Sequence, residues 1–308
     1  MDPLPINPTK HDVYDFISPT TGTEDAAVGK TVLVTGAGSG IGRHTAIYFA
    51  RAGATSVVLA GRNAKALEES KVVILAEAPK CDVLCIPTDI TDPSAVANLF
   101  QKAGKIDILI NNAGSTGIRG PLAATDFQKW WMAFEINVRG TYMVTCEFLR
   151  LLQGGPGVVL NVSSRSSYVT ASDMSAYQAS KSALNRLTEF IDKEHASQGV
   201  VAIAFHPGGI SNTKLAEDAP EWLRPDLIDT RESRSSSRPH QKETQLNRSN
   251  PAALPAATAL YLTLPRAKYL SGRFVNARWD MEELETHRER IISEDLLKLR
   301  VLGIDDHL

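Results

Sequence analysis

Tyr177 and Lys181, four residues apart, are spaced for acid–base chemistry. Side chains at this spacing lie on the same face of a helix. A free phenol titrates near pH ~10, which is too high for it to release a proton readily at neutral pH. A neighbouring ammonium group favours the phenolate, so we expect Lys181 to lower the pKa of Tyr177 towards the working range. The pair therefore predicts a tyrosine that donates and accepts a proton.

A glycine-rich segment, TGAGSGIG at residues 35–42, lies upstream of this pair. It joins a short apolar run, residues 31–35, to a helix that we expect to begin near Ile41. Glycines let such a turn tighten, and free N–H groups at a helix start attract phosphate. The spacing is Gly-x-x-x-Gly-x-Gly, unlike the Rossmann pattern Gly-x-Gly-x-x-Gly. We expect the turn to bind the pyrophosphate of a nicotinamide dinucleotide through Gly36, Ser39, Gly40, Ile41 and Gly42.

The end of the second apolar run selects between the two nicotinamide cofactors. Enzymes that use NAD usually place a carboxylate there to bind the ribose 2′-hydroxyl. This chain has Ala60-Gly61-Arg62 instead, and a guanidinium group can bind a 2′-phosphate in a forked geometry. The sequence therefore favours NADP(H), with NAD as the alternative. In the alternative interpretation Arg62 only begins the next helix, in solvent.

Composition excludes several classes of function. The chain has 308 residues, of which 43% are hydrophobic and 22% charged, which are ordinary values for a globular protein. A net charge of −2 gives no electrostatic basis for binding nucleic acid or a membrane surface. No apolar run is long enough to span a bilayer, and the N-terminus lacks the pattern of a signal peptide, so we expect a cytoplasmic protein. The three cysteines fit neither a disulfide framework nor a metal site, because no His or carboxylate cluster joins them.

The elements that must position these residues follow from apolar periodicity. Near-continuous apolar runs alternate with amphipathic stretches such as 43–53 and 122–152, which are long enough for crossover helices. Such runs indicate strands buried on both faces, and therefore a parallel sheet covered by helices. We expect a single doubly wound, Rossmann-like α/β domain of about seven strands. The expected strands are residues 31–35, 56–60, 83–87, 106–110, 158–162, 200–205 and 273–277.

Three regions lie outside this pattern. Residues 1–28 show no sustained periodicity and are expected to form an extension on the surface of a domain spanning 29–279. Residues 231–250 are polar and serine-rich, which indicates a disordered insert. Residues 280–308 mix charged and apolar side chains and predict an amphipathic helical tail, docked on this subunit or on a neighbour.

These motifs resemble those of the short-chain dehydrogenase/reductase superfamily, over about residues 30–277. The resemblance implies one Rossmann-like domain in which the cofactor and substrate sites share the carboxyl edge of the sheet. The matching positions are residues 35–42, Asp89, the Asn-Asn-Ala-Gly of residues 111–114, Asn137, Ser164, Tyr177, Lys181 and Pro207-Gly208.

The resemblance implies roles for the residues around Tyr177. It makes Tyr177 the general acid in carbonyl reduction and the general base in alcohol oxidation. Lys181 would also hold the nicotinamide ribose, and Ser164 would polarise the substrate oxygen, with Ser163 as its neighbouring alternative. Asn137 would anchor a water molecule that links Lys181 to solvent.

Further cofactor contacts are implied in the same way, from the ends of several strands. Asp89 would contact the adenine, or alternatively start a helix. His206 is expected to be a packed strand end. A substrate lid is expected over residues 213–230. The other implied contacts are Asn111, Asn112, Ala113, Gly114, Arg139, Pro207, Gly208, Ile210 and Thr213.

The sequence thus predicts an NADP(H)-dependent oxidoreductase that interconverts a carbonyl and a secondary alcohol on a small, apolar organic molecule. The ending Val275-Asn-Ala-Arg-Trp279 replaces the Asp-Gly-Gly that many members carry after the last strand. The chain thus resembles a divergent branch of fungal members with similar amino-terminal extensions and acidic C-terminal tails, which often serve specialised metabolism. A regulatory protein that has lost catalysis, and an epimerase or dehydratase on the same fold, are the alternatives. The resemblance also suggests a homodimer or homotetramer built on the helices of 122–152 and 176–195.

Overall fold

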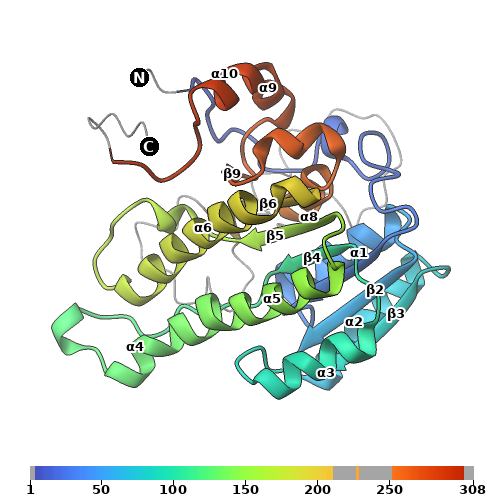
Figure 1. Cartoon of the computed structure of the whole chain (residues 1–308), viewed down its shortest axis with the longest axis horizontal. Helices are drawn as coiled ribbons and strands as arrows, with labels where there is room; N and C mark the ends of the chain where they lie inside the picture. Colours follow the sequence, from blue (N-terminus) through green and yellow to red (C-terminus); the bar gives the residue numbers. More distant parts are fainter. Residues whose placement is uncertain (1–3, 211–226, 229–251, 302–308) are drawn as a thin grey trace.

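The core of the protein is a seven-stranded parallel sheet with the strand order β3-β2-β1-β4-β5-β6-β9 (Figure 1). The computed structural model describes residues 4–210, 227–228 and 252–301. The expected strands are confirmed, with ends that differ by one or two residues. They are β1 (Thr31–Thr35), β2 (Ser56–Gly61), β3 (Asp82–Pro87), β4 (Ile108–Asn111), β5 (Gly157–Val162), β6 (Val200–His206) and β9 (Phe274–Asn276).

Helices cover both faces of the sheet, as the apolar strands require. One face packs against α1 (Gly40–Arg51), α2 (Ala64–Glu77) and α8 (Ala253–Leu262). The other packs against α3 (Pro93–Ala103), α5 (Thr141–Leu152) and α6 (Ser175–His195). A single doubly wound α/β domain is therefore confirmed. The strand order reverses between β1 and β4, where the carboxyl ends of the strands form the binding crevice of such folds.

The predicted helix over 122–152 contains an interruption that matters for the site. It comprises α4 (Phe127–Phe134), a π-helical turn (Glu135–Gly140) and α5. A π-helical turn inside an α-helix is frequent at functional sites, because it redirects side chains and backbone groups. Asn137 lies in this turn and is fully buried.

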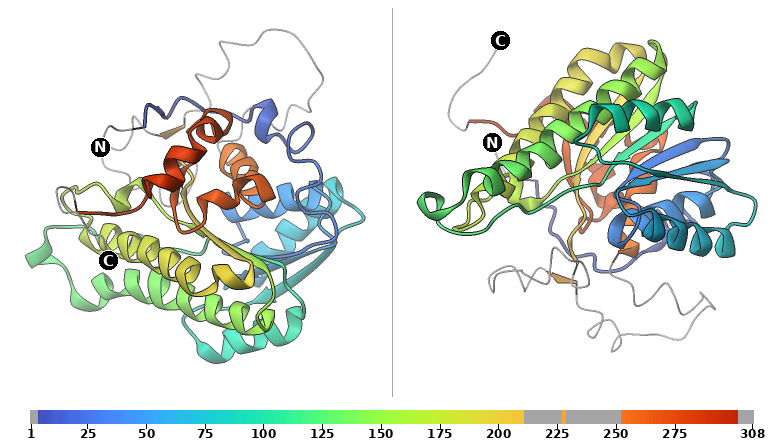
Figure 2. Two further views of the ribbon diagram at one scale, coloured as in Figure 1. Left: turned by 45° about the horizontal axis from the view of Figure 1, so that its top comes forward. Right: turned by 90° about the horizontal axis from the view of Figure 1, so that it is seen from below.

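The N-terminal extension is part of the hydrophobic core, contrary to the prediction that it lies on the surface. Ile17, in a 3-10 turn at Asp15–Ile17, is fully buried. The ammonium of Lys10 lies 2.7 Å from the carboxylate of Asp280, and the backbone N–H of Met281 donates to the Tyr14 hydroxyl at 2.7 Å. Figure 2 shows this blue segment beside the orange and red C-terminal helices.

The C-terminal tail forms two short helices, α9 (Met281–Thr286) and α10 (Arg288–Ser293), where a single helix was expected. Beyond them the chain runs beside β9, and the Phe274 N–H donates to the Leu297 carbonyl at 2.8 Å. Gly209–Ile210 (β7) pairs in parallel with Leu227–Ile228 (β8). The rest of the expected lid and the insert at 231–250 lie outside the described residues. None of the described helices has the length and apolarity needed to cross a membrane.

Candidate active site

Ser164, Tyr177 and Lys181 meet at the carboxyl end of β5, in the interior of the protein. Ser164 follows β5 within two residues, and α6 brings the other two back over the end of the strand. A side-chain hydrogen bond joins Ser164 to Tyr177. The Lys181 ammonium lies 5.8 Å from the centre of the Tyr177 ring and donates to the Val162 carbonyl at 2.7 Å. Since each of the three is at most 8% exposed, a reaction here would be shielded from bulk water.

Burial sets the protonation of this group. It raises the pKa of Tyr177, and the Ser164 hydrogen bond and the positive charge of Arg119 only partly oppose it. Burial also lowers the pKa of Lys181 to about 8. The direction for Tyr177 is opposite to the one expected from the sequence. The reason is that desolvation of the phenolate outweighs the nearby positive charge in this protein.

Asn137 ties the loop after β4 to α6. Its Oδ1 accepts from the Ser115 N–H at 2.8 Å, and its Nδ2 donates to the Ser115 carbonyl at 2.8 Å and to the Ser180 hydroxyl at 2.9 Å. Ser180 in turn donates to the Tyr177 carbonyl at 2.7 Å. The Asn137 side chain is thus committed to protein partners that fix the backbone around Tyr177, and its role towards a water molecule stays a prediction.

The glycine turn has the shape of a phosphate cradle. A Cβ on Gly42 would lie 2.4 Å from the Gly36 carbonyl oxygen, so α1 approaches the turn more closely than any side chain allows. Gly36 and Gly40 have φ values of +67° and +52°, which favour glycine. Ser39 caps α1 without a side-chain hydrogen bond, so this cap leaves the first N–H groups of the helix for an anion. With half-buried Ile41, these residues fit the pyrophosphate of a dinucleotide.

The two asparagines predicted at the end of β4 have different roles. Asn112 donates to the carbonyls of Thr35 and Gly36 at 2.9 and 3.2 Å, which holds the glycine turn against β4. Asn111 instead points into the interior, where its Nδ2 donates to Thr145 and Asn161, each at 2.9 Å. Asn111 therefore steadies the sheet and does not face the cofactor edge.

Ala113 and Gly114 lie where the loop after β4 passes Lys181 and Asn137. The Ala113 N–H donates to the Thr35 hydroxyl at 3.1 Å. A Cβ on Gly114 would lie 3.7 Å from the Lys181 ammonium and 3.2 Å from the Asn137 Oδ1. The absence of a side chain at Gly114 therefore leaves space beside Lys181 and Asn137.

The charged residues expected around the adenosine end lie at the surface. Arg62 is exposed just beyond β2, as a contact to a 2′-phosphate requires. Asp89 accepts from the N–H and hydroxyl of Thr91 at 2.9 and 2.8 Å; the N–H bond is the main reason that its pKa is lowered. Arg139 donates to Glu135 at 3.1 Å and to the Thr91 carbonyl at 3.0 Å. Arg139 thus belongs to a surface network.

The turn after β6 follows His206, the last residue of the strand. Burial, together with the charges of Arg165 and Arg278, lowers the pKa of His206 to about 3, so it is a neutral, packed strand end as expected. Pro207 and Gly208 follow, both buried, and Gly208 has a φ of +88°. The backbone of Ile210 lies in β7, whereas Thr213 lies outside the described residues.

Arg43 is a site residue that the sequence argument missed. Its guanidinium donates to the Gly38 carbonyl at 2.6 Å and to the Ser70 hydroxyl at 2.9 Å, and Ser70 donates to the Ala37 carbonyl at 2.9 Å. The glycine turn is thereby braced against α2. The signal in the sequence was the position of Arg43, directly after the last glycine of the motif.

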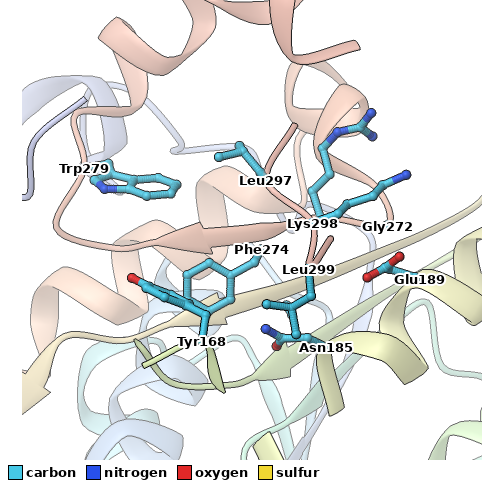
Figure 3. Close-up of a pocket in the computed structure, with 11 residues that line it drawn as sticks. Tyr168, Asn185, Glu189, Gly272, Phe274, Trp279, Leu297, Lys298 and Leu299 are labelled. Carbon is cyan, nitrogen blue, oxygen red and sulfur yellow. The ribbon is translucent and has the colours of Figure 1, made fainter. Parts of the chain in front are cut away.

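A cavity of about 360 Å³ is bordered by Asn185 of α6 and Phe274 of β9 (Figure 3). Its walls come from β9, α6 and the C-terminal tail, and Tyr168, Phe274, Trp279 and Leu299 are among the lining residues. None of the lining residues is Ser164, Tyr177 or Lys181. No group of three or more His, Cys, Asp or Glu suited to a metal ion occurs in the described part of the chain.

Comparisons with known proteins agree with this geometry. The family model described as short chain dehydrogenase matches residues 30–224. The chain is 36% identical over 305 residues to the short chain dehydrogenase mpl6 of Monascus purpureus, which covers 96% of both chains. It is 33% identical over 283 residues, 89% of both, to the short chain dehydrogenase andI of Emericella variicolor.

Solved structures are similar as well. A 7 alpha-hydroxysteroid dehydrogenase complexed with NADH and 7-oxo glycochenodeoxycholic acid has a TM-score of 0.68 at 26% identity; the match covers 82% of this chain and 94% of that one. Levodione reductase also has a TM-score of 0.68, at 27% identity, over 81% of this chain and 96% of that one.

Proposed function

Because this chain belongs to the short-chain dehydrogenase family and is an NAD(P)-dependent oxidoreductase, we propose that it interconverts a carbonyl group and a secondary alcohol. The observation that carries the proposal is the burial of a phenol, a hydroxyl and an ammonium together at the carboxyl end of β5. The substrate is proposed to be small and apolar, and the likeness to fungal relatives supports a place in specialised metabolism.

In the proposed reduction, each residue acts on the substrate oxygen or on its neighbours. Ser164 donates a hydrogen bond to the carbonyl oxygen and stabilises the charge that develops there. Tyr177 transfers its proton to that oxygen, which completes the alcohol. The nicotinamide, when bound, supplies the hydride that the carbonyl carbon receives. The raised pKa of Tyr177 keeps the phenol protonated at neutral pH, which suits its part as the acid in reduction.

Lys181 has two proposed tasks beside Tyr177. Its ammonium holds the hydroxyls of the nicotinamide ribose, and its charge stabilises the phenolate that remains after proton transfer. The Val162 carbonyl fixes the position of the ammonium, and no ion pair within the described part of the chain neutralises it.

NADP(H) is the proposed cofactor. Arg62 is exposed beyond β2, and the end of that strand, Ala60-Gly61, has no carboxylate that would repel a 2′-phosphate. The Michaelis constants for NADPH and NADH with one carbonyl substrate test this proposal. A clear preference for NADH would contradict it.

The proposed oligomer is a homodimer or homotetramer. Large apolar side chains are exposed on the helices named for this purpose, with Phe127 90%, Trp131 53% and Phe190 54% exposed. A second copy that covers them would remove this apolar surface from water.

Replacing Tyr177 with phenylalanine tests the proposed mechanism, on a panel of apolar ketones, aldehydes and secondary alcohols. The variant keeps the ring and its packing but has no proton to give, so turnover should be lost while NADPH binding is preserved. Retained turnover in this variant would remove Tyr177 from the mechanism. Tight NADPH binding by the wild-type protein without reduction of any carbonyl would indicate a regulatory protein instead.

A further inference from the structure

Asn185 holds both ends of the turn that carries Ser164. Its Oδ1 accepts from the Ser163 hydroxyl at 2.6 Å, and its Nδ2 donates to the Ser167 hydroxyl at 2.8 Å. Ser164 itself caps the 3-10 turn between them, since its hydroxyl accepts from the Ser166 N–H at 3.1 Å. A single buried amide thus binds the residue before Ser164 and the residue three positions after it.

The same face of α6 carries the proposed acid and this amide. Tyr177, Lys181 and Asn185 follow one another at intervals of four residues, the spacing of one helical face. Lys181 donates to the carbonyl of Val162, the residue directly before Ser163. The separation between the Ser164 hydroxyl and the Tyr177 phenol therefore depends on how Asn185 seats the turn against α6.

Packing alone does not account for an asparagine at this position. Asn185 is 5% exposed and borders the apolar cavity, where it lies near Tyr168 and Leu299 (Figure 3). Burying an amide costs free energy unless it is hydrogen-bonded, and a leucine of similar size would suit such a wall. The two bonds to Ser163 and Ser167 are what offsets this cost.

We propose that Asn185 is a positioning residue, which aligns Ser164 with Tyr177 by clamping the turn at residues 163–167. The inference rests on the proposed role of Ser164 in carbonyl reduction. It concerns a residue outside the motifs that identify the family.

The variant that tests this is Asn185→Leu, because it removes both bonds while the adjacent cavity accepts an apolar side chain. The matched control is Thr188→Val, one turn further along α6. Thr188 is also buried, and its hydroxyl accepts from Asn161 Nδ2 at 2.9 Å. The control variant therefore loses a hydrogen bond between α6 and β5 but none to the turn at residues 163–167. Both variants are made in the full chain.

We expect kcat for carbonyl reduction to fall about 10- to 100-fold in Asn185→Leu, the scale of a misplacement of ~1 Å in a catalytic group. The Kd for NADPH should be unchanged, and the deuterium isotope effect from the transferred hydride should rise, because the chemical step becomes slower. Amides of residues 163–168 should exchange with solvent faster. Thr188→Val should show none of these changes.

A result in which Asn185→Leu resembles Thr188→Val in kcat, or in the exchange of residues 163–168, overturns the proposal. If Asn185→Leu does not fold, the double variant Ser163→Ala/Ser167→Ala removes the same bonds from the other side and must give the same loss. Failure of the proposed function can be told apart from failure of the positioning role, because in the first case the wild-type protein and Tyr177→Phe are equally inactive. In that case the exchange of the amides of residues 163–168 still tests whether Asn185 holds the turn.

Discussion

Replacing Gly42 with alanine should weaken cofactor binding as well as the fold. A Cβ at this position would lie 2.4 Å from the Gly36 carbonyl oxygen, whereas ordinary contacts begin at 3.4 Å. The glycine turn and α1 must therefore separate by about 1 Å, the difference between these two values. The Asn112 amide, 2.5 Å from the same Cβ, blocks relaxation on that side.

The size of the effect follows from the bonds that this shift would break. Each hydrogen bond from a backbone N–H to a charged phosphate contributes about 1.5–3 kcal/mol. Because about 1.4 kcal/mol is a tenfold change in affinity, the loss of one such bond should raise the Kd for NADPH about 10- to 100-fold. Overpacking itself should cost about 1–3 kcal/mol of unfolding free energy.

Gly104→Ala is the control for this experiment. Gly104 has a φ of +66° and no atom within 4 Å of an added Cβ, so alanine there costs about 1–2 kcal/mol through backbone strain alone. Fluorescence titration with NADPH and thermal unfolding should show two similarly destabilised variants, of which only Gly42→Ala binds weakly. Wild-type affinity in Gly42→Ala would refute the assignment of this turn as the phosphate cradle.

Three other perturbations test separate parts of the structure. Since burial lowers the pKa of Lys181 to about 8, its ammonium is present below that pH and lost above it, so kcat/KM for reduction should fall as pH rises through about 8. In Lys181→Arg the decrease of kcat/KM above pH about 8 should be absent, whatever the absolute rate, because a guanidinium stays charged. An unchanged pH dependence of kcat/KM in this variant would show that another group titrates. Arg62→Asp should raise the KM for NADPH and lower that for NADH, as measured with one carbonyl substrate, and equal effects on both cofactors would contradict the contact to the 2′-phosphate. Ile17→Ala should lower the free energy of unfolding in urea by about 2–5 kcal/mol, because Ile17 is fully buried, whereas the control Val28→Ala, at a position 57% exposed, should change it by less than about 0.5 kcal/mol.

The fold was largely predictable because its signal is local. Strands buried on both faces of a parallel sheet are apolar along their whole length, and each expected run corresponds to a strand. The glycine turn and the spacing of Tyr177 and Lys181 were also readable, since each depends on residues close together in the chain. The apolar runs do not contain the order of the strands, which places the reversal between β1 and β4.

The N-terminal extension shows where local signals fail. Nothing in the periodicity of residues 1–28 marks Ile17 as a core residue. Its burial depends on helices α8 and α9, whose residues lie more than 200 positions later in the chain.

The sequence by itself determined which residues form the proposed catalytic group, because the motif of Ser164, Tyr177 and Lys181 consists of residue types at fixed spacings. Only the tertiary structure decided how that group is tuned and held. The pKa of Tyr177 is raised because the folded chain excludes water from the phenol, which no spacing encodes. Likewise, Asn111 faces the interior whereas Asn112 holds the glycine turn. The reason is that successive side chains at the end of a strand point in opposite directions and so reach different parts of the fold.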